Sequence, residues 1–322
     1  MTTNPPETSA VALSHWGLIR ARGADAASFL HGQLTQDVLH LGPAEARLAG
    51  YCSAKGRLLA SFVMWKPNVD EVLLACHVSV LPATLKRLSM FVMRAKCQLS
   101  DATAELELRG VCGEAAAHAA AGLQPWGRTG DAGTTWIRLP DVSGIVRAWR
   151  VSGRLGDPVP PGPQDAAQLG HWQRLEVESG IPVIEAATVD QFVPQMLNYE
   201  LIGAVNFQKG CYPGQEVVAR SQYRATAKRR AFLFNCEANA AAGQEVFHSA
   251  DASQPAGMVV NAAELPHTVD QASGCVALVE VKLSALDAGT LHLGAVDGAR
   301  LTRLPMPYDV PTTVDGETGS AV

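Results

Sequence analysis

Apolar residues in the first 180 positions of this 322-residue chain recur with two different periods. Short alternating or continuous apolar runs predict strands, which we expect at residues 18–22, 57–65, 71–76, 105–111, 136–139 and 144–151. Spacings of three and four residues predict helices, which we expect at residues 25–34, 81–92 (capped by Ser79), 114–121 and 165–179. Helices mixed with antiparallel hairpin spacings are typical of an α+β fold.

The remainder of the chain has mostly strand patterns. A short strand is expected at residues 205–208 and a helix at 214–223. Beyond Arg230 the short β runs suit a small barrel or sandwich, and they lie at residues 231–235, 245–247, 257–261, 275–283 and 300–304. Proline and glycine at residues 156–163 predict a surface loop, and the composition of residues 1–10 and 305–322 predicts disordered ends.

Composition and charge narrow the class of protein. Hydrophobic residues make up 47% of the chain and charged residues 18%, which is enough apolar material for a buried core. The net charge of -5 repels phosphate backbones on average and disfavours a general nucleic-acid coat. The longest run without a formal charge, residues 72–85, has 14 residues and is shorter than the roughly 18–20 that a membrane-spanning helix needs. We therefore expect no membrane partner.

Cysteine usage indicates the compartment. The seven cysteines contain no CxxC pair, and no two lie closer than fifteen positions, which argues against a zinc ribbon, a dithiol redox motif and a secreted disulfide framework. Residues 1–10 contain no basic residue and no apolar core of a secretion signal. No histidine or acidic pattern of a metal site occurs. The sequence therefore predicts a cytoplasmic protein without a resident metal.

The densest group of glycine, polar and cysteine residues is FQKGCYPGQEVVAR at residues 207–220. Gly210, Pro213 and Gly214 predict a tight turn that places Cys211 near the start of a helix. Lys209 stands two residues before the cysteine, and both a helix N-terminus and a nearby ammonium stabilise a thiolate. Cys211 is therefore the candidate reactive thiol, whereas the other six cysteines are expected to be small buried hydrophobes.

Several motifs resemble those of one known family. FVPQMLN at residues 192–198, KGCYPGQE at 209–216 and VAR at 218–220 are similar to the signature of the YgfZ-like folate-binding proteins, relatives of the glycine-cleavage T-protein. Supporting segments are GQLTQDV at residues 32–38, CSAKG at 52–56 and RLEVESGIP at 174–182. The resemblance spans about residues 18–230.

The resemblance implies a three-domain ring of two α+β domains and a C-terminal β-barrel around a central hole. It places residues 1–47 with 142–227 in the first domain, 48–141 in the second, 228–305 in the barrel and 306–322 in a disordered tail. The hole would hold tetrahydrofolate or a one-carbon derivative. The implied role is the assembly or repair of iron–sulfur proteins, including those that modify tRNA, so the implied partners are such client proteins or assembly factors.

The resemblance also bears on catalysis. In the T-protein relatives a folate-bound aminomethyl group is transferred, and paired aspartates stand on the strand that matches residues 56–64. Here Ala60 and Ser61 occupy those positions, so the proton-handling acid of the transfer is absent. Folate-dependent aminomethyl or methyl transfer is therefore the alternative function, and a non-catalytic interaction protein with a vestigial folate pocket is the second alternative.

Roles for individual residues follow from the same resemblance. Glu178 matches the relatives' pterin-contacting carboxylate, with an exposed helix-end charge as the alternative. Lys209 could meet the folate carboxylates, stabilise the Cys211 thiolate or be solvated. Gln195 and Asn198 carry amides that suit either pterin edges or loop closure.

The end of the motif adds further candidate folate contacts. Tyr212 belongs to the motif, and Gln215 and Glu216 lie in the first helical turn, where an acid is favoured by the helix dipole without any function. Arg220 is one helical turn from Arg224, so the two could face one anion, the folate tail or an acidic partner. This basic segment has few aromatic residues beside it, which disfavours direct RNA contact.

Overall fold

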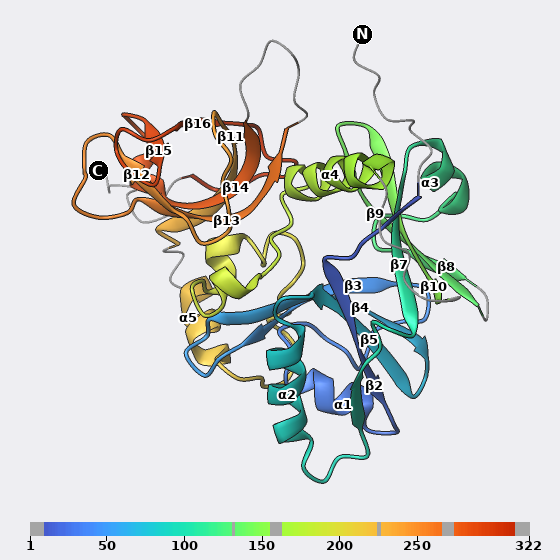
Figure 1. Ribbon diagram of the computed structural model, residues 1–322. Coiled ribbons are helices and arrows are strands. Elements are labelled where there is room, and N and C mark those ends of the chain that lie inside the picture. The colour runs from blue at the N-terminus through green and yellow to red at the C-terminus, as the bar shows by residue number, and fades with distance from the viewer. Residues whose placement is uncertain (1–9, 131–132, 155–162, 224–226, 266–273, 313–322) are drawn as a thin grey trace, which may run out of the picture.

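The computed structural model describes residues 10–130, 133–154, 163–223, 227–265 and 274–312. It contains two five-stranded antiparallel sheets and a closed six-stranded barrel (Figure 1). Within these residues no helix is long and apolar enough to cross a membrane. The loop predicted at residues 156–163 lies outside the described residues except for Pro163, where a helix begins, and so do most of the predicted disordered ends.

The first sheet is a meander built largely from consecutive strands. Its order is β3 (Ala46–Cys52), β4 (Leu58–Asn68), β5 (Glu71–His77), β2 (Trp16–Arg22) and β6 (Gln98–Asp101). Its strands are almost continuously apolar because helices α1 (Ala26–His31) and α2 (Leu81–Val92) and other segments bury both faces. The strand and helix predictions for this region are confirmed, except for the cap of α2: its N-cap residue is Val80, and the Ser79 hydroxyl instead accepts a hydrogen bond from the Ala186 N–H.

The second sheet carries the helix that reaches the site. Its order is β1 (Ala10–Ala12), β7 (Leu106–Cys112), β10 (Ile145–Gly153), β9 (Thr134–Val142) and β8 (Arg128–Gly130), with α3 (Glu114–Ala119) beside it. Helix α4 (Pro163–Glu178) packs directly on β7, because a Cβ on Gly110 would lie 2.5 Å from the Trp172 ring. Figure 1 shows α4 between this sheet and the barrel.

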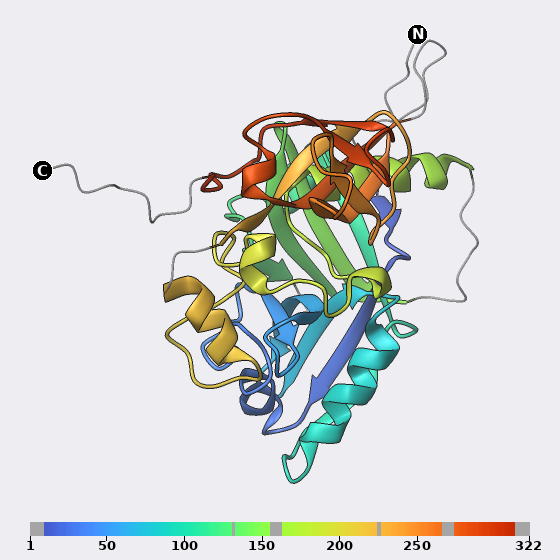
Figure 2. The same ribbon diagram turned by 90° about the vertical axis from the view of Figure 1, so that its left-hand side faces the viewer.

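The segment after α4 returns to the first sheet through η1 (Ala186–Thr188), η2 (Pro194–Leu197) and α5 (Gln215–Tyr223). Figure 2 shows α5 at one side of that sheet and α2 at the other. The strand predicted at residues 205–208 does not form. The Asn206 N–H reaches the carbonyl of Thr35, but the Gln208 N–H turns back to the side chain of Asn206, so the chain bends after a single contact.

The barrel predicted after Arg230 is confirmed. Its strands are β11 (Arg229–Cys236), β14 (Cys275–Lys282), β13 (Gly257–Glu264), β12 (Glu245–His248), β15 (Leu291–Leu293) and β16 (Arg300–Arg303), and a 3-10 turn, η3 (Leu283–Ala285), follows β14. Residues 305–312, expected to be disordered, pack against the rest of the chain: the Tyr308 hydroxyl donates to the carbonyl of Gly180 over 2.6 Å.

The two sheets do not follow the expected domain boundaries. Strand β3 runs across the boundary expected between residues 47 and 48, and residues 16–101 form one sheet. The second sheet combines residues 10–12 with 106–153, because β1 pairs with β7 and not with its neighbour in sequence. The α+β class with a C-terminal barrel nevertheless agrees with the sequence prediction.

Candidate functional site

A cavity has walls from both sheets, α4 and the segment that follows it. Its inner part has a volume of about 40 Å³, and a wider cleft of about 360 Å³ shares four wall residues with it. The shared residues are Trp16, Glu176, Ile181 and Val183. Large aromatic side chains, including Trp16, Phe62 and Trp149, form much of the inner wall. The cavity therefore offers flat apolar surfaces with few polar groups, which is typical of a small-molecule site.

Glu176 is the one carboxylate in the described wall of the inner cavity. Its Oε1 accepts hydrogen bonds from the indole N–H groups of Trp16 (2.9 Å) and Trp172 (2.7 Å), and its Oε2 lies 2.7 Å from His15 Nε2. Burial alone would raise the pKa of Glu176, but His15 and the two indole donors lower it overall. Glu176 is therefore held ionised and in a fixed orientation.

Helical spacing explains why Glu176, and not Glu178, enters the cavity. Glu176 is one turn after Trp172 and shares its inward face, whereas Glu178 is one turn after Arg174 and pairs with it at 3.7 Å. Glu178, for which we predicted a pterin contact, lines neither the cavity nor the cleft. Trp172 is a large apolar residue of the helix predicted at residues 165–179, and the spacing of four from it was the signal that could have identified Glu176.

Two further polar groups lie in the inner wall. Arg147 is almost fully buried and donates to the backbone carbonyls of Pro140 and Leu175, and burial lowers its pKa to about 10. The Trp149 indole meets Trp16 edge to face with ring centroids 4.9 Å apart. Its buried Nε1 has no hydrogen-bond partner among the residues that the structure describes. An unpaired buried donor in a cavity wall is a candidate ligand contact.

The strand position that carries aspartates in the T-protein relatives is also in this wall. Ser61 lines the inner cavity, and its Oγ accepts a hydrogen bond from the Ile184 N–H over 2.9 Å. Ala60 is fully buried and does not line the cavity. A hydroxyl group therefore stands where the resemblance places an acid.

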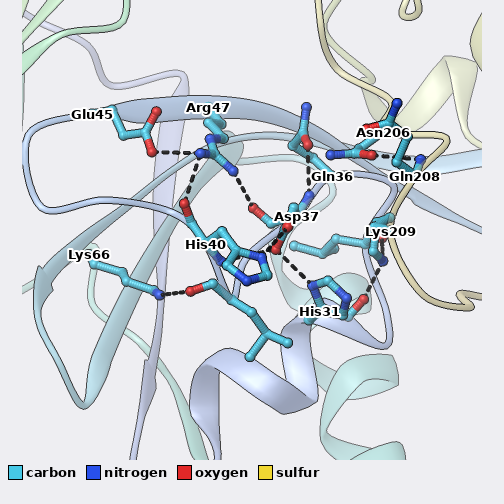
Figure 3. Close-up of polar contacts among 12 residues, drawn as sticks. His31, Gln36, Asp37, His40, Glu45, Arg47, Lys66, Asn206, Gln208 and Lys209 are labelled. Atoms are coloured by element: carbon cyan, nitrogen blue, oxygen red, sulfur yellow. Dashed lines mark hydrogen bonds and ion pairs between the residues drawn. The ribbon is translucent and has the colours of Figure 1, made fainter.

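Lys209 lines neither the described inner cavity nor the described wider cleft. Its Nζ donates to the backbone carbonyl of His31 at the end of α1 (Figure 3). It also donates to the Leu34 carbonyl over 2.7 Å and lies 4.9 Å from the centroid of the buried Tyr212 ring. The side chain is 9% exposed, which excludes the solvated alternative. Burial lowers the pKa of Lys209 to about 8, partly opposed by Asp37 and Cys211.

Cys211 is exposed, four residues before α5 begins at Gln215. The turn that carries it is pressed against the hairpin at residues 53–56: Gly214 has a φ of 80°, and a Cβ there would lie 2.6 Å from the Gly56 Cα. The KGCYPGQE motif at residues 209–216 and the CSAKG motif at 52–56 therefore contact each other. Cys211 itself lines neither described part of the cavity. Five of the other cysteines are buried and Cys97 is partly so.

The remaining predicted contacts also lie outside the described cavity walls. The Gln195 amide donates to the Val218 carbonyl and the Asn198 amide to the Ala231 carbonyl, both over 2.8 Å, as loop closure requires. Gln215 is partly buried, and Glu216 and Arg220 are exposed on α5. Of the basic residues near the start of the barrel, Arg224 lies outside the described residues, Arg229 pairs with Glu280, and Arg230 pairs with Glu200.

Two sheets, a closed barrel and an aromatic cavity between them define a protein with the fold of the glycine-cleavage T-protein. The structure is similar to the crystal structure of the glycine cleavage system aminomethyltransferase T from Bartonella henselae, with a TM-score of 0.67 over 95% of this chain and 86% of that one, at 14% sequence identity. This likeness confirms the predicted ring architecture.

Sequence comparison identifies the family. The chain is 32% identical over 314 residues to the tRNA-modifying protein YgfZ of Edwardsiella ictaluri (strain 93-146), covering 92% of this chain and 91% of the relative. It is 28% identical over 319 residues to the tRNA-modifying protein YgfZ of Enterobacter sp. (strain 638), covering 93% of each. No protein-family model matches the chain. The chain belongs to the YgfZ family.

Proposed function

We propose that this protein binds tetrahydrofolate or a one-carbon derivative and supports the assembly or repair of iron–sulfur proteins, including tRNA-modifying enzymes, with Cys211 as its functional thiol. The observation that carries the folate part is the ionised Glu176 carboxylate fixed in an aromatic cavity. The names of the relatives, tRNA-modifying proteins, support the link to tRNA modification.

The cavity residues fit a reduced pterin. An ionised carboxylate has about four acceptor sites, of which Trp16, Trp172 and His15 use three, so Glu176 can accept a further N–H from a pterin. The unpaired Trp149 N–H can donate to a pterin carbonyl, and the indole faces can stack on the ring. A reduced folate bound there would carry a one-carbon unit.

The described cleft does not offer the folate tail the lysine and arginine side chains that we predicted for it. The described wall of the wider cleft contains no lysine or arginine, and its basic groups are His15 and His77. Lys209 is engaged at the end of α1 and lines no part of the cleft. The proposed affinity therefore comes mainly from the pterin end.

The residues of the cavity favour folate binding without aminomethyl or methyl transfer. A transferase needs a group that gives or takes a proton near neutral pH. Glu176 has a lowered pKa and three donors, so it stays ionised, and Ser61 replaces the acid on β4. The described inner wall contains no histidine, and His15 and His77 line only the wider cleft. The exposed Cys211, in contrast, is available to a client protein.

Folate titration of paired variants by calorimetry tests the pocket. Glu176→Gln removes the charged acceptor, and we expect about 1.5–3 kcal/mol weaker binding, which is roughly 10- to 150-fold in affinity. Glu178→Gln is the matched control two residues away, and its affinity should equal that of the wild type. Equal affinity of Glu176→Gln and wild type would exclude this pocket.

Complementation tests the thiol. Cys211→Ser should fold and bind folate like the wild type but should not restore the activity of iron–sulfur enzymes in a strain that lacks the protein. Full complementation by Cys211→Ser would remove the thiol from the mechanism. The matched control is Cys97→Ser, the other cysteine with partial exposure, which should complement fully.

A further inference from the structure

A carboxylate and two histidines form a polar cluster after α1 (Figure 3). Asp37 Oδ1 lies 3.1 Å from His31 Nδ1, and Asp37 Oδ2 lies 2.7 Å from His40 Nδ1. The side chains of Asp37 and His31 are 13% and 15% exposed, whereas that of His40 is 82% exposed. Burial alone would raise the pKa of Asp37, but hydrogen bonds from His40 and the charges of both histidines lower it to about 2, so Asp37 is ionised at neutral pH.

This cluster adjoins the turn that carries Cys211. The His31 Nε2 atom lies 3.6 Å from the point that a Cβ on Gly210 would occupy, so the imidazole is next to the backbone just before the cysteine. Asp37 lies on the Nδ1 side of the ring as an ion-pair partner without hydrogen-bond geometry, and its charge favours the tautomer with the proton on Nδ1. The free lone pair is then on Nε2, the atom that faces the turn.

Charged groups from the neighbouring segments act on Asp37 and His31. Burial lowers the pKa of His31, and Lys209, whose Nζ bonds the His31 carbonyl, lowers it further, while Asp37 partly opposes this shift. Arg47 donates to the Asp37 carbonyl over 3.0 Å, and Lys66 interacts electrostatically with Asp37. Lys209 also interacts with Cys211. The imidazole therefore contacts an ionised acid, and the ammonium group of Lys209 acts on both His31 and Cys211.

We propose that Cys211, His31 and Asp37 act as one unit, in which the exposed Cys211 side chain rotates toward His31 and transfers its proton to Nε2. This inference rests on the proposed role of Cys211 as the functional thiol. Asp37 orients the imidazole and stabilises its protonated form, as the third member of a nucleophile–base–acid group does.

The chemistry suits a soft electrophile such as a disulfide. The Sγ–H proton moves to His31 Nε2, and the electron pair stays on sulfur. The Cys211 sulfur then bonds one sulfur of the disulfide, and the other sulfur leaves and takes the proton from His31. No further oxidant or reductant is needed.

Alkylation by iodoacetamide, followed by peptide mass spectrometry, reports the thiolate of Cys211 directly. In that reaction the sulfur displaces iodide, so the rate follows the thiolate fraction across a pH series. We expect His31→Gln to shift the rate–pH profile to higher pH and to slow alkylation at neutral pH by roughly tenfold for each unit that the thiol pKa rises. The measurement uses the full chain with Cys97→Ser as background.

His40→Gln is the matched control, because His40 contacts the same carboxylate but is the exposed partner. Its profile should coincide with that of the background protein. If His31→Gln does not fold, Asp37→Asn is the second variant, and it should also shift the profile upward. Coincident profiles for the folded His31 or Asp37 variant and the background protein would overturn the inference. The assay uses neither folate nor a client protein. The inference about Cys211, His31 and Asp37 can therefore be tested even if the proposed function is wrong.

Discussion

The contact between the Cys211 turn and the hairpin at residues 53–56 can be tested by adding one methyl group. Gly214 has a φ of 80°, and a Cβ there would lie 2.6 Å from Gly56 Cα and 2.7 Å from Gly56 N. A left-handed backbone costs an L-residue roughly 1–2 kcal/mol, and overpacking against a backbone that must shift costs roughly 1–3 kcal/mol more. Gly214→Ala should therefore lower the free energy of unfolding by about 2–5 kcal/mol.

Gly122→Ala isolates the conformational part of this cost. Gly122 has a φ of 77°, and nothing lies within 4 Å of a Cβ built on it. Its substitution should cost roughly 1–2 kcal/mol only. Urea unfolding followed by tryptophan fluorescence measures both variants. If Gly214→Ala destabilises the protein no more than Gly122→Ala does, the two turns are not in contact and the reasoning is refuted.

Three further outcomes are expected. Because the folded state lowers the pKa of Glu176, its contribution to stability is present above the ordinary value of 4.5 and is lost as pH falls through the lower folded value. Urea unfolding across the acid range should show a steeper loss for the wild type than for Glu176→Gln, and equal slopes would contradict this. Asn198→Ala leaves a buried barrel carbonyl unpaired and should lower the free energy of unfolding by about 1–3 kcal/mol, measured in urea. Burial raises the pKa of Cys52 to about 12, so mass spectrometry should find it unmodified under native conditions that alkylate Cys211.

Local patterns predicted the elements well, because a period of two or of 3.6 is a property of neighbouring residues. The barrel strands beyond Arg230 follow from such runs, but β15 (Leu291–Leu293) was missed because three residues are too few to show a period. The strand predicted at residues 205–208 failed for a related reason. Its apolar residues suit a strand. Its backbone N–H groups, however, bond to one carbonyl and to one side chain, and not to a neighbouring strand.

Contacts between segments that are far apart in the sequence could not be predicted from local patterns. Lys209 suggested a cation for a folate or a thiolate, but its ammonium caps a helix that ends 178 residues earlier. The domain boundaries also depended on which strands pair, and β1 pairs with β7 across about a hundred residues of chain. Cys211 was correctly placed just before a helix, but the imidazole next to Gly210 comes from α1, and no local spacing indicates it.

The inner cavity draws its walls from Trp16 near one end of the described chain to Ala204, through both sheets and α4. No single stretch of sequence contains the whole wall, so a fragment carrying either sheet alone lacks a complete pocket. A nascent chain completes the described wall of the pocket only after Ala204 has left the ribosome. Any ligand that fills it would also join the two sheets, so occupancy would stabilise both together.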